Sequence, residues 1–291
     1  MFLTKDNNQN PNFNKYFSIN DSFSSKINSY YFTTTERLGA GGNGAVYECI
    51  DNSGNILAVK FLLNLSDKAK TRFLQEIDIL KKLNHPHIIK YYDSGSVNGI
   101  EGKNKEVSIL FIVMEKADGN IVDYMRTNGD ISYEIYAPQI RGLSAALGYL
   151  HDYAFHRDIK PENILVRGET WLLSDLGLCT AVDEDEQIGI TNINERIGPK
   201  YWLSPEAIDK MYFGNEEVDA ASDVYQLSAV FWFIITRRYP LGIIDDDDVN
   251  EYKGNVCRQI LAALKYNKAK RFNNGKKLFD TICNVTLYRD E

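Results

Sequence analysis

The sequence has few cysteines and no long hydrophobic run. Its four cysteines lie far apart and form neither a Cys-x-x-Cys motif nor a Cys/His spacing suited to zinc. The longest apolar runs, residues 109–114 and 229–235, are too short to span a bilayer, and the first residues do not resemble a signal peptide. We therefore expect reduced thiols, no membrane partner and a cytoplasmic location, in the producing cell or in a host cell.

The sequence also lacks an excess of basic residues. It contains 33 Lys and Arg against 40 Asp and Glu, which gives a formal net charge of -7. Binding to a phosphate backbone favours a basic protein, so nucleic acid is not an expected partner. Hydrophobic residues make up 44% and charged residues 25% of the 291 positions, close to the averages for soluble globular proteins. The chain is thus expected to be soluble and folded, as one large domain or two lobes.

Composition divides the chain into three parts. Residues 1–31 are rich in Asn and Ser without helical or strand periodicity, which indicates a flexible or loosely docked extension. Residues 32–118 hold five short β-rich runs and one helix that begins near Ser66 and ends before His85. Residues 119–291 are mainly helical. The predicted fold class is α+β and bilobal: a small five-stranded antiparallel sheet with one helix, then a larger, mainly helical lobe. The β-rich runs are residues 32–38, 45–50, 56–62, 88–92 and 109–114.

A glycine-rich segment follows the first β-rich run. It has the pattern Gly-x-Gly-x-x-Gly-x-Val, in which backbone N–H groups can approach phosphates without interference from Cβ atoms. Strand-like residues on both sides place the glycines at the tip of a hairpin, whereas a Rossmann loop would lead into a helix. The pattern predicts a nucleotide-phosphate site, with a simple glycine-rich turn as the alternative. The residues concerned are Gly39, Ala40, Gly41, Gly42, Asn43, Gly44 and Val46.

A lysine and a glutamate are expected to form an ion pair. Lys60 lies in a strand that otherwise alternates apolar residues, and a cation there needs an anionic partner. Glu76 falls in the middle of the apolar face of the predicted helix, so this inward carboxylate also needs a partner. A pair between Lys60 and Glu76 would hold the lysine against nucleotide phosphates. The alternative is a surface pair between Glu76 and Arg72, one turn away in the same helix.

Residues 156–163, His-Arg-Asp-Ile-Lys-Pro-Glu-Asn, have the pattern of a phosphoryl-transfer loop. Asp158 would accept or orient the proton of a substrate hydroxyl, and Lys160 would steady the transferred phosphoryl group. Asn163 and Asp175 would bind Mg²⁺ through their side-chain oxygens. Each of these residues alone could be a solvated loop residue, but their order along the chain favours the catalytic interpretation.

Together these segments resemble the signature motifs of the eukaryotic-type protein kinase family, over roughly residues 32–287. The resemblance implies a kinase that uses ATP and Mg²⁺, or Mn²⁺ as an alternative ion, to phosphorylate a protein substrate. It also implies that ATP lies between the lobes, with Met114 as the gatekeeper residue and the backbone of residues 115–117 bonded to the adenine. The adenine site implied by the resemblance comprises Val46, Ala58, Met114, Glu115, Ala117 and Leu165.

The resemblance implies two structural contacts as well. Glu206, in a Ser-Pro-Glu motif, is expected to pair with Arg271. Asp223, in a buried central helix, is expected to anchor a stack of apolar side chains that links the lobes: Leu80, Tyr91, His156 and Leu176. Leu176 stands where the family usually has Phe, and Ser228 where it often has Gly. Both departures are expected to affect packing more than chemistry.

Two features give conflicting indications of substrate specificity. A lysine at position 160, two residues after Asp158, resembles the catalytic loop of Ser/Thr kinases. Pro199 stands where that class usually has Thr, and together with Trp202 it is more similar to the corresponding loop of tyrosine kinases. Because Lys160 touches the reacting phosphate, Ser/Thr specificity is favoured, with tyrosine or dual specificity as the alternative. A pseudokinase scaffold is disfavoured because Lys60, Asp158 and Asp175 are all retained. A small-molecule kinase of the same fold is disfavoured because such enzymes generally lack the Ser-Pro-Glu motif.

Autophosphorylation is a further expectation, and self-association is one route to it; the sequence does not determine the oligomeric state. In such kinases the arginine at position 157 commonly binds a phosphate of the activation segment, and the acidic residues 183–186 could supply that charge without modification. The candidate sites are Thr180, Thr191 and Tyr201. A second acidic run, residues 245–248, is expected to be a solvated loop, with docking of a basic partner as the alternative.

Overall fold

The computed structural model describes residues 1–4, 16–40, 44–181, 201–214, 217–242, 244–249 and 256–286. The chain divides into two compact units: Met1–Leu83 with Lys90–Ala117, and Asn84–Ile89 with Asp118–Glu291. The change of unit after Ala117 falls one residue before the expected boundary, whereas the short segment 84–89 belongs to the second unit. In the described ranges, no helix combines the length and the apolar character needed to cross a membrane.

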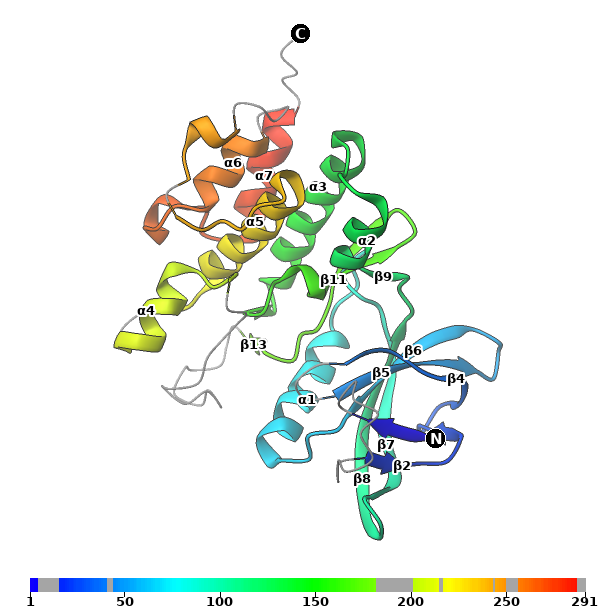
Figure 1. Ribbon diagram of the computed structural model, residues 1–291. Helices are drawn as coiled ribbons and strands as arrows, with labels where there is room; N and C mark the ends of the chain where they lie inside the picture. The colour runs from blue at the N-terminus through cyan, green and yellow to red at the C-terminus, as the bar shows by residue number, and fades with distance from the viewer. Residues whose placement is uncertain are drawn as a thin grey trace. The chain divides into compact units, whose positions relative to one another are not determined.

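An eight-stranded antiparallel sheet forms the first unit (Figure 1). Its strand order is β1-β2-β7-β8-β6-β5-β4-β3, and one helix, α1 (Asp67–Leu80), contacts it. The five strands expected from the sequence are present as β4 to β8. The strands are β1 (Phe2–Thr4), β2 (Tyr16–Ser18), β3 (Ser22–Ser24), β4 (Ser29–Ala40), β5 (Gly44–Asp51), β6 (Ile56–Leu62), β7 (Tyr91–Glu101) and β8 (Lys105–Glu115).

Among the described residues, the sheet has eight strands rather than five because residues 1–31 contribute three more, β1 to β3. Each of these strands buries one apolar side chain: Leu3 is 0%, Phe17 is 2% and Phe23 is 3% exposed. The expectation of a flexible or loosely docked extension is therefore wrong for the described part of this segment. Strands of 3 residues in an Asn- and Ser-rich context are too short to show a two-residue periodicity, so composition concealed them.

The sheet is strongly curled around an aromatic core. β1 and β5 are five positions apart in the strand order, which corresponds to about 24 Å in a flat sheet. Nevertheless the Thr4 amide nitrogen lies 3.1 Å from the Tyr47 hydroxyl oxygen. At the other end of the sheet, the ring of Phe23 in β3 lies 4.9 Å from the ring of Phe111 in β8. The core on this face comprises Leu3, Phe17, Ile19, Phe23, Tyr30, Ala45, Tyr47, Cys49, Leu57, Val59, Phe61, Leu63, Ile109, Phe111 and Val113.

The second unit is mainly helical, and α5 (Ala220–Thr236) contacts three other helices of it (Figure 1). α5 is buried on nearly every side, as expected for a core helix whose sequence is apolar all round. The segment 84–89 joins this unit through backbone hydrogen bonds of His87 and Ile89 to Leu173, each 2.9 Å long. The other helices are α2 (Ile121–Asn128), α3 (Tyr133–Leu150), α4 (Pro205–Phe213), α6 (Val256–Ala263) and α7 (Gly275–Thr286). The strands are β9 (Gly119–Asn120), β10 (Ala154–Phe155), β11 (Ile164–Arg167), β12 (Thr170–Leu173) and β13 (Thr180–Ala181).

Candidate active site

The expected ion pair between Lys60 and Glu76 is present in the first unit. Lys60 Nζ lies 2.7 Å from Oε1 and 2.9 Å from Oε2 of Glu76. Lys60 comes from β6 and Glu76 from α1, and their side chains are 17% and 4% exposed. The ring of Phe73, which precedes Glu76 by about one turn of α1, lies 5.8 Å from the ammonium. Two contacts to one carboxylate therefore fix the position of the lysine head group.

Val46, Ala58 and Met114 lie on the same face of the sheet as Lys60. Val46 is the register partner of Lys60, and Ala58 is the register partner of Met114. Ala58 precedes Lys60 by two residues, and the period of a strand places both on one face. Ala58 and Met114 are buried, whereas Val46 is partly exposed. This face offers apolar contacts beside a fixed cation, a combination that suits a ligand with an apolar and an anionic part.

Glu115 ends β8, and Ala117 is the last residue of the first unit. Glu115 Oε1 accepts a hydrogen bond from the Lys90 N–H at 2.7 Å, and the Glu115 N–H donates to the Lys90 carbonyl at 2.9 Å. The side chain of Glu115 is buried in this contact. A role of Glu115 in nucleotide binding would therefore fall to its backbone, as the family resemblance implies.

The ends of the glycine-rich segment are the ends of β4 and β5. Gly39, Ala40 and Gly44 are described there, whereas Gly41, Gly42 and Asn43 lie outside the described residues. A Cβ atom at Gly44 would collide with the backbone carbonyl of Phe61 in β6, while a Cβ at Gly39 would meet no atom within 4 Å. Only glycine permits the close approach of β5 and β6 at position 44.

In the second unit, α5 anchors the catalytic loop through Asp223. Asp223 Oδ2 accepts the His156 N–H at 2.7 Å, and Oδ1 accepts the Arg157 N–H at 2.8 Å. Burial alone would raise the pKa of Asp223, but the hydrogen bonds from His151 and from the Arg157 N–H help to outweigh burial and lower it. Arg157 has a φ of 65°, which is uncommon for a non-glycine residue. The two bonds to Asp223, from the N–H of Arg157 and of the residue before it, restrain the backbone at this position.

Asp158 contacts both Lys160 and Asn163 through one oxygen. Its Oδ2 lies 3.0 Å from Lys160 Nζ and 2.9 Å from Asn163 Nδ2. Asn163 Nδ2 also donates to the Asp158 carbonyl at 2.8 Å, so both amide hydrogens point to Asp158 and Asn163 Oδ1 points elsewhere. Burial raises the pKa of Asp158, although Lys160 opposes this effect. The arrangement leaves Asp158 Oδ1 as the oxygen that can receive another partner.

The residue before Asp175 is tied to Asn163. The Ser174 N–H and Oγ both donate to the Asn163 carbonyl, at 3.0 and 2.9 Å. His156 connects the same segments, because its Nε2 lies 3.2 Å from the Ser174 carbonyl and its Nδ1 accepts the Asp158 N–H at 3.3 Å. A neutral imidazole with its hydrogen on Nε2 satisfies both contacts. Asp175 itself has a φ of 60°, a left-handed conformation that aspartate tolerates better than most residues.

Gln226 was missed by the sequence analysis, although it contacts both neighbours of Asp158. Its Oε1 accepts the Ile159 N–H at 3.1 Å, and its Nε2 lies 3.5 Å from the Arg157 carbonyl. The side chain is 2% exposed and follows Asp223 by three residues on α5. A polar residue in an otherwise apolar helix needs a buried partner, and this signal was available in the sequence.

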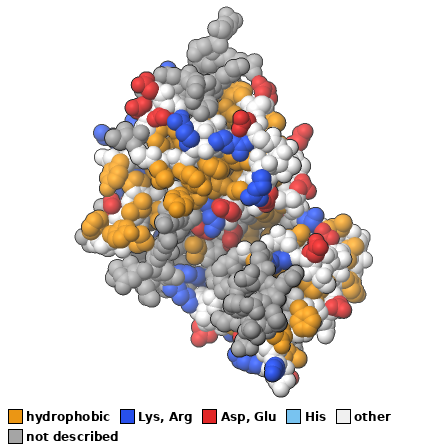
Figure 2. Space-filling model, in the orientation of Figure 1, with side chains coloured by type: hydrophobic (Ala, Val, Ile, Leu, Met, Phe, Trp, Pro, Cys, Tyr) orange, Lys and Arg blue, Asp and Glu red, His pale blue; other side chains and the backbone are white. Residues whose placement is uncertain are grey.

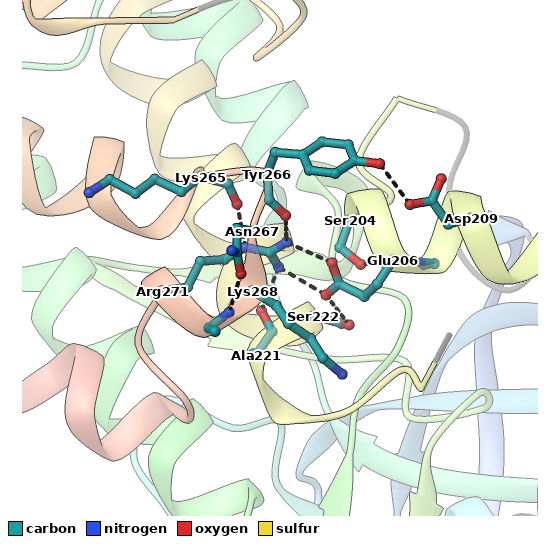
Figure 3. Close-up of polar contacts among 12 residues, drawn as sticks. Ser204, Glu206, Asp209, Ala221, Ser222, Lys265, Tyr266, Asn267, Lys268 and Arg271 are labelled. Carbon is teal, nitrogen blue, oxygen red and sulfur yellow. Dashed lines mark hydrogen bonds and ion pairs between the residues drawn. The ribbon is translucent and has the colours of Figure 1, made fainter. Parts of the chain in front are cut away.

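The expected pair between Glu206 and Arg271 is present (Figure 3). Arg271 Nη1 donates to Glu206 Oε1 at 2.9 Å, and Nη2 donates to Oε2 at 2.6 Å. Ser222 Oγ donates to the same Oε1 at 2.5 Å. Burial tends to raise the pKa of Glu206, but the hydrogen bonds from Arg271 and Ser222 outweigh it and lower the pKa. This pair links α4 to the segment before α7 and is structural.

The donor set of the second unit suits Mg²⁺. Asn163 offers an amide oxygen and Asp175 a carboxylate, and Mg²⁺ in phosphoryl-transfer sites is bound by one or two carboxylates together with substrate phosphates. No cluster of three or more His, Cys, Asp or Glu able to hold a metal occurs among the described residues. Leu165, the expected apolar contact of the adenine in this unit, lies in β11 and is partly exposed.

Several expected residues lie outside the described part of the chain: Thr191, Pro199 and the acidic residues 183–186. Trp202 is described, is 6% exposed, and packs against Phe233 and Tyr239 with ring centroids 5.4 and 5.2 Å away. In the second acidic run, Asp248 forms an ion pair with Arg238 at 3.3 Å. At least one charge of that run is therefore used within the fold.

Comparison with known proteins identifies the family. The model described as "Protein kinase domain" matches residues 32–290. The chain is 30% identical over 81% of its length to a probable serine/threonine-protein kinase of Dictyostelium discoideum. It is 30% identical over 87% of its length to the probable serine/threonine-protein kinase PknB of Bifidobacterium longum. It is 32% identical over 74% of its length to the serine/threonine-protein kinase cds1 of Schizosaccharomyces pombe.

The chain belongs to the protein kinase family. The aligned regions span only 25%, 36% and 46% of these three relatives. The match to the family includes both units but excludes β1, β2 and β3. The family uses ATP and a divalent metal ion in general, which agrees with the donor groups described above.

Proposed function

We propose that this chain is a Mg²⁺-dependent kinase that phosphorylates Ser or Thr hydroxyl groups of proteins. The contact that carries the proposal is the 3.0 Å approach of Lys160 Nζ to Asp158 Oδ2. It places a cation beside the carboxylate that would receive the substrate hydroxyl, as the resemblance to Ser/Thr kinases implies. The names of the three relatives support the same specificity.

Asp158 would orient the substrate hydroxyl and accept its proton. Its Oδ2 is occupied by Lys160 and Asn163, so Oδ1 is the oxygen that would accept the hydroxyl hydrogen. Burial raises the pKa of Asp158, which brings it closer to the operating pH and makes it a better proton acceptor. Lys160 would meanwhile balance negative charge next to this carboxylate.

The other residues of the site would act by holding charged groups in position, since phosphoryl transfer depends mainly on orientation and electrostatics. ATP bound with Mg²⁺ would supply the γ-phosphoryl group and partly neutralise its charge. Asn163 Oδ1 and the Asp175 carboxylate would hold the metal ion. Lys60 would contact the phosphates, and its ion pair with Glu76 at 2.7 Å keeps its head group in one position.

Two observations favour a protein substrate over a small molecule. The Ser-Pro-Glu motif is built into the fold through the pair between Glu206 and Arg271. Hydrophobic side chains also gather on the helical unit (Figure 2), and on α4 Tyr212 and Phe213 are 72% and 73% exposed. Exposed apolar patches are typical of surfaces that bind other proteins.

Phosphoamino-acid analysis tests the proposed specificity. The chain is incubated with labelled ATP and Mg²⁺ on mixed protein acceptors, and the labelled products are hydrolysed. Phosphoserine and phosphothreonine are the expected products. Phosphotyrosine as the main product would instead support the tyrosine alternative indicated by Pro199, and omission of Mg²⁺ should abolish labelling.

Autophosphorylation and a cytoplasmic location remain predictions. Tyr201 is 50% exposed, and Thr180 lies in β13, where it pairs with Phe155. Mass spectrometry of the purified chain, compared with an Asp158→Asn variant, should find phosphate on residues 175–206 of the active form only. Fractionation of the producing cells would test the location.

A further inference from the structure

β1 lies outside the region that matches the kinase family, yet it contacts both strands of the glycine-rich hairpin. The Thr4 N–H donates to the Tyr47 hydroxyl at 3.1 Å, and the Thr4 carbonyl accepts from Arg37 Nη1 at 2.8 Å. Tyr47 belongs to β5 and Arg37 to β4. One peptide segment is thus held by side chains from the two strands that carry the glycines.

These contacts lie at the base of the hairpin. Arg37 and Tyr47 are register partners across β4 and β5. Arg37 precedes Gly39 by two residues, and Tyr47 follows Gly44 by three. Val46 neighbours Tyr47 on the opposite face of β5, the face that also carries Lys60. A shift of this base would therefore move Val46 together with Gly39 and Gly44.

Near the base of the hairpin, few residues of β4 are paired with residues of β5. The register of β4 against β5 passes from Phe32↔Cys49 to Arg37↔Tyr47, and it shifts again before Gly39. Four residues of β4 therefore face a single residue of β5, and a bulge of this kind interrupts the ladder and bends the strand. Where ladder bonds are missing, side-chain contacts determine more of the position of the hairpin.

β1 is itself firmly held. Leu3 pairs with Phe17 of β2 and is 0% exposed. Tyr47 is 1% exposed, and its ring lies 6.1 Å from Phe32 and 6.3 Å from Phe61. The two ends of the contact between Thr4 and Tyr47 are thus fixed by burial, so the contact can transmit a constraint from the N-terminal strands to the hairpin.

We propose that β1 is a clasp that positions the glycine-rich hairpin and thereby strengthens ATP binding. The clasp consists of the Thr4 peptide groups, Arg37 and Tyr47. This inference rests on the proposed kinase function and assigns a role to a segment that the family match does not include. Arg37 and Tyr47 are positioning residues, which act through Val46 and the glycines rather than by touching the nucleotide.

The test compares nucleotide affinity with turnover in the full chain. Tyr47→Phe removes only the hydroxyl, and Arg37→Gln removes the cation. Each variant should weaken binding of a fluorescent ATP analogue in the presence of Mg²⁺ by about three- to tenfold, the equivalent of one hydrogen bond. The KM for ATP should rise in parallel, while kcat changes by less than about twofold. Such a split separates positioning of the nucleotide from general damage to the fold.

Matched controls use residues outside the clasp. Tyr31→Phe changes a half-exposed tyrosine of β4, and Arg126→Gln changes an exposed arginine of α2. Both should bind the analogue as the unchanged chain does. Thr4→Pro is a second probe of the clasp, because the Thr4 N–H donates to Tyr47 and proline is tolerated in edge strands where the N–H is not part of the ladder. This variant should weaken binding as Tyr47→Phe does.

Unchanged analogue affinity in Tyr47→Phe and Thr4→Pro would overturn the clasp. A fall in kcat with an unchanged KM for ATP would also overturn it. Failure of the unchanged chain to transfer phosphate to any acceptor would count against the proposed function instead. Analogue binding is measured without transfer, so the two failures are distinguishable.

Discussion

Replacement of Arg271 by methionine should destabilise the second unit strongly. The Arg271 side chain is 0% exposed and donates five hydrogen bonds, two to Glu206 and three to the carbonyls of Lys265, Tyr266 and Ala221. Methionine retains much of the apolar stem but leaves the buried Glu206 carboxylate without its cation. Removal of one partner of a buried pair costs about 3–5 kcal/mol, a large share of the roughly 5–15 kcal/mol that stabilises a typical domain.

Urea denaturation followed by circular dichroism measures this loss. Arg126→Met is the control, because Arg126 forms an exposed pair with Asp123 at 3.0 Å and such pairs contribute about 1 kcal/mol or less. The double variant Arg271→Met/Glu206→Leu should be more stable than Arg271→Met alone, since it also removes the unpaired charge. A loss for Arg271→Met no larger than that for Arg126→Met would refute the reasoning.

The same pair predicts a pH dependence. The pKa of Glu206 is lower in the fold than in the unfolded chain, so the pair stabilises the fold fully above the unfolded pKa of about 4.3. This stabilisation should be lost as the pH falls below that value and Glu206 becomes protonated. Denaturation midpoints of the unchanged chain should therefore fall more steeply with acid than those of Glu206→Gln. Parallel acid profiles would contradict the assignment.

Three further outcomes are expected. Gln226→Met removes the bonds to Ile159 and Arg157 at nearly constant side-chain volume. The kcat should therefore fall about tenfold, the equivalent of about 1.4 kcal/mol, with little change in the KM for ATP. An unchanged kcat would show that Gln226 does not position Asp158. Gly275→Ala should lower the free energy of unfolding by about 1–3 kcal/mol, because a Cβ at this position would collide with the backbone of α3. The control in the same denaturation assay is Gly119→Ala, because a Cβ at position 119 would make only ordinary van der Waals contacts. The transfer rate should rise with pH as Asp158 loses its proton, with a midpoint above the ordinary aspartate value of about 3.9; a midpoint at or below that value would contradict the raised pKa.

The charged contacts could be predicted from the sequence because a charge in an apolar setting requires a partner. Lys60 interrupts an apolar strand and Glu76 an apolar helical face, and the two are joined at 2.7 Å. The pair between Glu206 and Arg271 was predicted only from the family resemblance, since 65 residues separate the partners and no local pattern connects them. The predicted order of five strands and one helix followed from five β-rich runs and from the capping residues of the helix.

The N-terminal strands could not be predicted by the same reasoning. Each contains one buried side chain, and no periodicity can be read from a single residue. Their stability comes from the rest of the sheet: Phe23 packs between β4 and β8, where its ring lies 5.2 Å from Tyr30 and 4.9 Å from Phe111. Such contacts exist only after the sheet has curled, so tertiary packing rather than local propensity determines these strands. The clasp at Thr4 depends on the same curl.

Transfer of the γ-phosphoryl group of ATP to protein hydroxyls is the central claim. The most direct measurement is incorporation of label from γ-labelled ATP into mixed protein acceptors, for the unchanged chain and for Asp158→Asn in parallel. Asparagine keeps the size of the side chain but cannot accept the hydroxyl proton as a carboxylate does. We expect Mg²⁺-dependent labelling by the unchanged chain and loss of nearly all of it in Asp158→Asn, with both proteins binding the ATP analogue. Equal labelling by the two proteins, or none by the unchanged chain, would contradict the account.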